Sequence, residues 1–315
     1  MSNPPASKST IGRTLPLAPS PLRWLLGGAS RLSPGWTSAW AARQFLRPRR
    51  RPVNGRVPGG ASGAGGAGAR RRDVSFEVDG VAIAATHWGA VGAARGALLV
   101  HGWEGRGEQL APFAELLARR EYQGLTFDFP AHGSSGGSST NFVEMAAVLR
   151  AAAERLAELR ATADGVPRLD AVIAHSAGCV ATLVARERGL DVDRLVFVAS
   201  PADLGGFGDV FATVLGLSPE VRRRLQARIE QRIGVTWEAI APERVARRLP
   251  PRPTLVLHDA ADREVDLEHG RRLAAALAGS ELAVTSGLGH NRILRDPEVL
   301  RRALEFLERA STRAC

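Results

Sequence analysis

Three short stretches of this chain carry side chains that together could perform nucleophilic catalysis. Ser176 lies in the segment AHSAG (174–178), Asp262 follows the apolar run PTLVLH, and His290 follows the glycine-rich segment SGLG. A serine hydroxyl is a poor nucleophile until a base removes its proton, and a histidine does this when a carboxylate orients its ring and balances its charge. The sequence therefore predicts Ser176 as the nucleophile, His290 as the general base and Asp262 as the orienting acid.

Other polar side chains compete for these roles. Carboxylates close to Asp262, or at the end of the preceding strand, are alternative acids; they are Asp203, Asp259 and Asp266. Ser176 alone could also be an ordinary turn residue. Its place between an apolar run and a helical segment, and the chain order Ser, Asp, His, favour catalysis. We expect His101 and His132 to organise loops by hydrogen bonding, and His175 to pack beside the site or line it.

The three catalytic candidates must be positioned by a sheet. From residue 74 onward, short apolar runs alternate with segments of helical periodicity. Runs that are apolar throughout indicate strands buried on both faces, and hence a mostly parallel sheet sandwiched by helices. The expected strands are a hairpin within 74–88 and runs at 96–100, 124–129, 170–174, 194–199, 253–258 and 281–285, which make eight in all. The expected helices lie near 108–119, 141–163, 177–188, 266–278 and 297–310.

Charge and composition divide the chain into parts. The net charge is +10, yet residues 1–72 contain thirteen Lys and Arg residues and no Asp or Glu, so residues 73–315 carry a net charge of −3. We interpret 1–72 as a basic, partly disordered N-terminal extension, in which the tryptophan-containing segment 21–46 could form one or two short helices. We expect its basic part to be a solvated linker. The alternatives are that this part binds anionic lipid, binds nucleic acid or directs the protein to an organelle. The interval 203–250 is too long for an ordinary connection and predicts a small helical lid inserted in the domain 73–315.

With these segments in view, the sequence resembles the α/β-hydrolase family over nearly all of 74–312. Besides the three catalytic stretches, the resemblance includes LLVHGWEG (98–105) and FDFPAHGSS (127–135), in which Ala131 stands where the family has glycine. The segment GLGHNRILRDP and the basic extension are similar to bacterial members of undefined substrate. The resemblance implies an oxyanion hole formed by the backbone N–H groups of Trp103 and Ala177.

The resulting functional prediction is a cytoplasmic serine hydrolase that cleaves a small carboxylic ester or thioester through a covalent acyl-enzyme (EC 3.1.1 class). No cofactor, metal or nucleic acid is expected, since no metal-ligand spacing and no nucleotide-binding glycine motif occurs; weak membrane-surface contact through the basic tail is allowed. Two cysteines and the absence of a long apolar run fit a reducing compartment and no membrane span. Three alternative functions remain open: a lactonase, an acyltransferase, and a non-catalytic or very slow small-ligand receptor. The sequence does not indicate the substrate or the oligomeric state.

Overall fold

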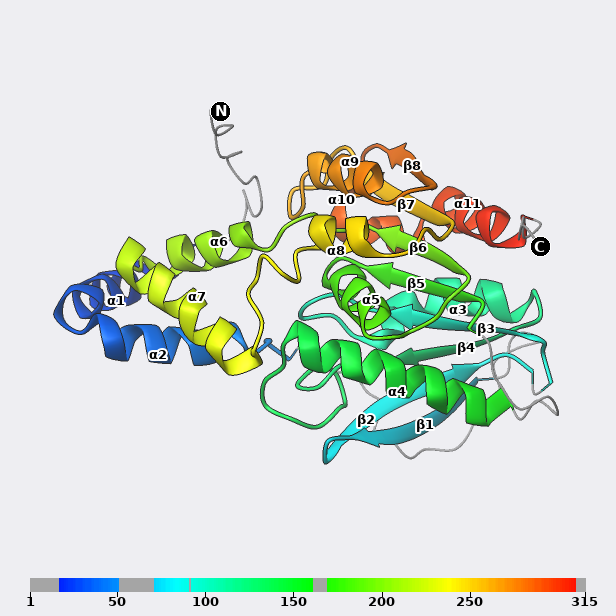
Figure 1. Cartoon of the computed structure of the whole chain (residues 1–315), viewed down its shortest axis with the longest axis horizontal. Helices are drawn as coiled ribbons and strands as arrows, with labels where there is room; N and C mark the ends of the chain where they lie inside the picture. The colour runs from blue at the N-terminus through cyan, green and yellow to red at the C-terminus, as the bar shows by residue number, and fades with distance from the viewer. Residues whose placement is uncertain (1–16, 51–70, 91, 161–168, 310–315) are drawn as a thin grey trace.

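The computed structural model describes residues 17–50, 71–90, 92–160 and 169–309. Within them, an eight-stranded sheet in the order β1-β2-β4-β3-β5-β6-β7-β8 forms the centre of the fold (Figure 1). The strands are β1 (Arg71–Val78), β2 (Val81–Trp88), β3 (Arg95–Val100), β4 (Tyr122–Phe127), β5 (Ala171–His175), β6 (Arg194–Val198), β7 (Thr254–Asp259) and β8 (Ser280–Thr285). The β1–β2 and β2–β4 pairs are antiparallel, and all the other neighbours are parallel. The expected mostly parallel sheet is therefore confirmed, with its antiparallel strands at one edge.

Helices cover both faces of this sheet, as the apolar runs predicted. Every residue of β4, β5 and β7 is buried. Along β3, Leu98 and Val100 belong to the hydrophobic core that contains α4 and α5, whereas Ala97 and Leu99 belong to the core that contains α3 and α11. The flanking helices are η1 (Gly107–Leu110), α3 (Ala111–Ala118), α4 (Phe142–Arg160), α5 (Ala177–Glu187), α9 (Leu267–Ala276), α10 (Gly289–Arg292), η2 (Ile293–Arg295) and α11 (Pro297–Glu308). Among the described residues, no helix combines the length and the apolarity that a bilayer span requires.

The register of the parallel strands brings the three catalytic stretches to one edge of the sheet. Ala174 of β5 pairs with Val100 of β3 on one side and with Phe197 of β6 on the other. At the far end, Asp259 of β7 pairs with Thr285 of β8. Because parallel strands end at the same edge, the loops that carry Ser176, Asp262 and His290 all leave the sheet on one side.

A group of helices extends from this edge, and it is built from two distant parts of the chain. Between β6 and β7 lie α6 (Gly205–Leu215), α7 (Pro219–Ile233) and α8 (Pro242–Arg248), in the interval where a helical lid is expected. From the N-terminal extension come α1 (Ser20–Leu32) and α2 (Pro34–Phe45). Figure 1 shows α1, α2, α6 and α7 together at one end of the molecule, and we call these four helices the cap. In contrast, α8 contacts α5 and α9 beside the sheet.

The N-terminal helices are held to the cap by specific contacts. The amide of Ala18 donates to the carbonyl of Val214 at 3.0 Å, and Arg228 Nε of α7 donates to Ser38 Oγ of α2 at 3.0 Å. At the end of α2, the ring of Phe45 stacks on Trp237 with centroids 5.4 Å apart and meets Phe211 edge-on at 5.2 Å. Segment 17–46 therefore packs as a structural part of the cap.

The packing of Phe45 leads to a stability prediction. Phe45→Ala should lower the free energy of unfolding by about 2 kcal/mol, since a half-buried aromatic ring loses its contacts and leaves a cavity. Urea unfolding followed by circular dichroism measures the change. The control is Leu32→Ala, at a side chain that is 89% exposed, which should shift stability by less than about 0.5 kcal/mol. Equal effects of the two substitutions would contradict this role for Phe45.

Candidate active site

Ser176 occupies the sharp turn between β5 and α5. Its backbone lies at φ +51° and ψ −121°, a left-handed conformation that is unfavourable for a residue with a side chain. Its amide donates to the carbonyl of Val198 at 2.9 Å, which ties the turn to the end of β6. At Gly178, a Cβ atom would lie 2.6 Å from the carbonyl oxygen of His101 and 2.9 Å from that of Val100. Only glycine fits there. Turns of this kind usually have the form Gly-x-Ser-x-Gly, and the first glycine is replaced here by Ala174, which is accommodated with no exposed surface.

His290 and Asp262 form a buried hydrogen-bonded pair. Nδ1 of His290 donates to Oδ2 of Asp262 at 2.7 Å, while the other carboxylate oxygen of Asp262 accepts the amides of Glu264 at 2.8 Å and Val265 at 3.0 Å. Burial would raise the pKa of Asp262, but the hydrogen bond and charge of His290, together with these amides, outweigh it and hold the pKa below its usual value. The carboxylate therefore stays ionised and fixes the orientation of the imidazole ring.

The three alternative acids have other partners. Asp259, at the end of β7, accepts the Thr285 hydroxyl and the amides of Ala261, Leu288 and Gly289 at 2.8–3.0 Å. Asp266 accepts the Glu268 amide at the start of α9, and Asp203 pairs with Arg272 at 2.9 Å. Asp259 thus anchors the loop that precedes His290. The sequence offered Asp259 only as a candidate acid, because its anchoring role depends on the pairing of β7 with β8, which places it opposite Thr285.

His175, the residue directly before Ser176, contacts His290. Nε2 of His175 donates to the carbonyl of His290 at 3.0 Å, and the two rings lie 4.7 Å apart. In the described arrangement the hydroxyl of Ser176 makes no hydrogen bond to His290, whose Nε2 faces Oε2 of Glu264 at 3.9 Å. Catalytic hydrogen bonds of this kind often form only in the substrate complex.

Glu264 is a site residue that sequence analysis missed. Its half-exposed carboxylate accepts a hydrogen bond from Nδ2 of Asn291 at 3.1 Å. The other carboxylate oxygen lies 3.9 Å from Nε2 of His290. It therefore adds a negative charge at the mouth of the site. The signal in the sequence is its spacing of two residues from Asp262, within the same short loop.

Two buried histidines hold the loops on the other side of Ser176. Nε2 of His101 accepts the amide of Phe129 at 3.0 Å, so its Nδ1 carries the proton and donates to the Gly102 carbonyl at 2.7 Å. Nε2 of His132 likewise accepts the amide of Glu104 at 3.0 Å, and its Nδ1 donates to Pro130. These contacts match the organising role expected of both rings, and they fix the turn that contains Gly102.

This turn lies against Ser176, next to the two amides expected to form an oxyanion hole. A Cβ atom on Gly102 would lie 2.9 Å from Cβ of Ser176. Trp103 follows directly and packs its ring edge-on against His132, at 5.5 Å between centroids. Ala177 is the first residue of α5, where backbone N–H groups have no partner within the helix. The turn that contains Gly102 and the start of α5 thus lie on two sides of the serine.

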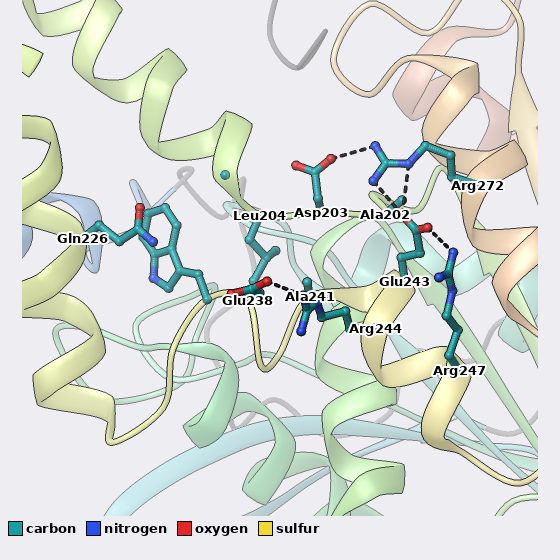
Figure 2. A pocket seen from close by; sticks show the side chains of 12 residues that line it. Ala202, Asp203, Leu204, Gln226, Glu238, Ala241, Glu243, Arg244, Arg247 and Arg272 are labelled. Atoms are coloured by element: carbon teal, nitrogen blue, oxygen red, sulfur yellow. Dashed lines mark hydrogen bonds and ion pairs between the residues drawn. The ribbon is translucent and has the colours of Figure 1, made fainter. Parts of the chain in front are cut away.

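A cavity of about 410 Å³ lies apart from this constellation, between the cap and helices α8 and α9 (Figure 2). Leu204 and Trp237 are buried and line it, but none of Ser176, Asp262 and His290 does. Figure 2 shows Arg272 reaching both Asp203 and Glu243, at 2.9 and 2.6 Å. The charged groups that face this cavity are thus paired with one another.

Burial of imidazole rings near Ser176 links folding to pH. Burial, the largest cause, lowers the pKa of His101 to about 4 and the pKa values of His132 and His175 to about 3. Each ring therefore stays neutral in the folded protein, whereas the unfolded chain protonates it near pH 6.5. The stabilisation is fully present above about pH 6.5 and is lost as the pH falls toward the folded pKa.

We expect the free energy of unfolding to decrease steeply between about pH 6.5 and pH 4, by up to roughly 3 kcal/mol for each ring. Urea unfolding at a series of pH values measures this dependence. His132→Gln, whose side-chain oxygen can still accept the Glu104 amide, should give a flatter profile. A variant profile parallel to that of the wild-type protein would show that His132 is not one of the responsible groups.

Comparison with known proteins gives a family and a fold. Residues 97–303 match the model of the alpha/beta hydrolase family. Similar solved structures include an esterase of Pyrococcus furiosus, with TM-score 0.61, 21% identity, and coverage of 84% of this chain and 97% of that one. They also include the esterase RhEst1 of Rhodococcus sp. ECU1013, with TM-score 0.54, 19% identity, and coverage of 76% of this chain and 98% of that one.

A third similar structure is the 2-hydroxy-6-oxo-6-phenylhexa-2,4-dienoate hydrolase of Rhodococcus sp. strain RHA1, with TM-score 0.54, 19% identity, and coverage of 77% of this chain and 100% of that one. Among curated proteins, none gives a significant match to the chain. At these identities the solved structures establish the fold, and the family model spans most of the sheet and all three catalytic stretches. The chain belongs to the α/β-hydrolase family.

Proposed function

We propose that this protein is a serine hydrolase that cleaves a carboxylic ester or thioester through a covalent acyl-enzyme. The observation that carries the proposal is the buried 2.7 Å hydrogen bond from His290 Nδ1 to Asp262 Oδ2. A ring held in this way carries its proton on Nδ1, so its Nε2 lone pair is free to act as a base. Ser176, on its strained turn between β5 and α5, supplies the hydroxyl from which this base would remove the proton.

In the proposed mechanism, the oxygen of Ser176 attacks the carbonyl carbon while Nε2 of His290 takes the hydroxyl proton. The carbonyl electrons move to the oxygen, and the backbone N–H groups of Trp103 and Ala177 stabilise the resulting charge. One such donor typically accounts for about 3 kcal/mol of transition-state stabilisation. Collapse of the tetrahedral species breaks the bond to the leaving group, which receives the proton from His290.

Deacylation repeats these steps with water as the nucleophile. His290 removes a proton from water, the hydroxide adds to the acyl carbon, and the bond to Ser176 breaks as the serine regains its proton. An alcohol or an amine in place of water would give acyl transfer, and a cyclic ester would give lactone opening, with the same residues. The ionised Asp262 compensates the positive charge that His290 carries in each tetrahedral state.

The central test of this proposal is a panel of esters and thioesters of varied acyl length. Wild-type protein should hydrolyse at least one member, and Ser176→Ala should reduce kcat/KM by at least about 10³-fold. A fluorophosphonate should label the wild-type protein and Ser138→Ala, a control at an exposed serine of another loop, but not Ser176→Ala. No labelling and no turnover would favour a small-ligand receptor on the same scaffold over an enzyme.

A matched pair of substitutions separates the roles of two nearby aspartates. Asp262→Asn should reduce kcat by about 10³- to 10⁴-fold with little loss of stability, because the ring of His290 loses its orientation and its compensating charge. Asp259→Asn should instead lower the free energy of unfolding by about 2 kcal/mol, because an amide cannot accept from four donors at once. Steady-state kinetics and urea unfolding on both variants provide the measurements. The reverse assignment of losses would contradict Asp262 as the acid.

A further inference from the structure

The exposed apolar side chains of the protein gather on one segment. Eight large hydrophobic residues are exposed in the described part of the chain, and six of them fall within residues 17–36. These six are Leu17, Leu22, Trp24, Leu25, Leu32 and Trp36. Trp24 is 82% exposed and Leu32 89%, whereas the two outside the segment, Leu282 and Val284 of β8, are exposed by only 36% and 43%. Such a concentration is typical of a surface that meets an apolar phase.

This exposure is a property of one face of α1. Leu26 and Ser30, four residues apart, are the buried residues of the helix, where it packs on the rest of the cap. At 100° per residue, Trp24, Leu25 and Leu32 project on the opposite side. Figure 1 shows α1 at the extreme end of the molecule, with the other cap helices between it and the sheet. We call this outward side of α1, together with Trp36 at the start of α2, the apolar tip.

The charge around the apolar tip has one sign. Residues 17–50 contain six arginines and no Asp or Glu, and two of them, Arg23 and Arg31, lie on α1 itself. Arg31 is exposed and immediately precedes Leu32. The whole segment 1–72 holds thirteen Lys and Arg residues without a single acidic one. Within this segment, exposed apolar side chains combined with cations and no acids match the interface of an anionic bilayer, where both find favourable surroundings.

We propose that the apolar tip docks the protein on the surface of an anionic lipid bilayer. Trp24, Leu25 and Leu32 enter the boundary between headgroups and acyl chains, and the exposed Arg31 beside them binds a lipid phosphate. Tryptophan suits this boundary because its ring is apolar and its indole N–H is polar. In this orientation the cap faces the membrane and the sheet lies away from it.

Two other partners could occupy this surface, a second copy of the chain and a nucleic acid, and its charge and apolar side chains argue against them. A second copy of the chain docked tip to tip would bring the acid-free, basic helices α1 and α2 against their equivalents, and like charges at an interface oppose association. A nucleic acid would satisfy the arginines but would leave Leu25 and Leu32 against a polar backbone. Docking on lipid requires no turnover, so it holds or fails independently of the proposed hydrolase function.

The test is flotation of the full chain with vesicles of phosphatidylcholine alone or mixed with phosphatidylglycerol. We expect binding to the mixed vesicles that weakens with added salt. The double substitution Trp24→Ser and Leu32→Ser should reduce this binding by at least about tenfold, through loss of apolar insertion. Arg31→Gln should reduce it by about fivefold, the contribution of one basic residue near an anionic surface.

The matched control is the double substitution Leu282→Ser and Val284→Ser on β8, which should leave vesicle binding within about twofold of wild type. Circular dichroism and thermal unfolding establish that each variant is folded. Absence of binding to the mixed vesicles, or equal binding by the apolar-tip variant and wild type, would overturn the proposal. It would also be overturned by an equilibrium dimer that the apolar-tip variant abolishes, or by binding to duplex DNA in preference to the mixed vesicles.

Discussion

The sharp turn at Ser176 is the constraint on which the rest of the site depends. A side chain is held at φ +51° because the amide of this residue bonds to the end of β6 and because α5 begins immediately against the end of β3. The close approach of α5 to the end of β3 requires glycine at position 178, where a methyl group would collide with two carbonyl oxygens. The sheet and the first turn of α5 thus maintain the strained backbone of Ser176.

The histidines around this turn divide according to the groups that face them. His101 and His132 face backbone amides and carbonyls, so burial leaves them neutral and they serve as rigid cross-links between loops. His290 instead faces an ionised carboxylate that is supported by two backbone amides. The same side-chain type therefore braces loops where its Nδ1–H meets a carbonyl, and it has the orientation that the proposed proton transfer requires where its Nδ1–H meets a charge.

Much of this arrangement could be predicted from the sequence, because local patterns determined it. The runs of β4, β5 and β7 are apolar throughout since both faces are covered. The observed limits of β2 to β8 lie within two residues of the predicted ones, and β1 begins three residues earlier than predicted. The chain order Ser, Asp, His did not separate Asp262 from Asp203, Asp259 and Asp266, which also lie between Ser176 and His290. What could not be predicted depends on contacts between distant residues: Asp259 as the anchor of the loop before His290, and Glu264 beside the ring of His290, became recognisable only once β7 and β8 were paired in register.

The cap illustrates the same limit on a larger scale. Helices α6 and α7 leave an apolar side that α2 covers, through Phe45 against Phe211 and Trp237, although more than 160 residues separate these partners in the chain. No periodicity within residues 21–46 specifies such a partner. Because one side of the N-terminal helices is committed to the cap, only their outer side is left to meet another surface, and on α1 that side carries leucines and a tryptophan rather than charge. The two sides of the N-terminal helices are therefore separable: the inner side completes the packing of α6 and α7, and the outer side carries the surface for which we propose docking.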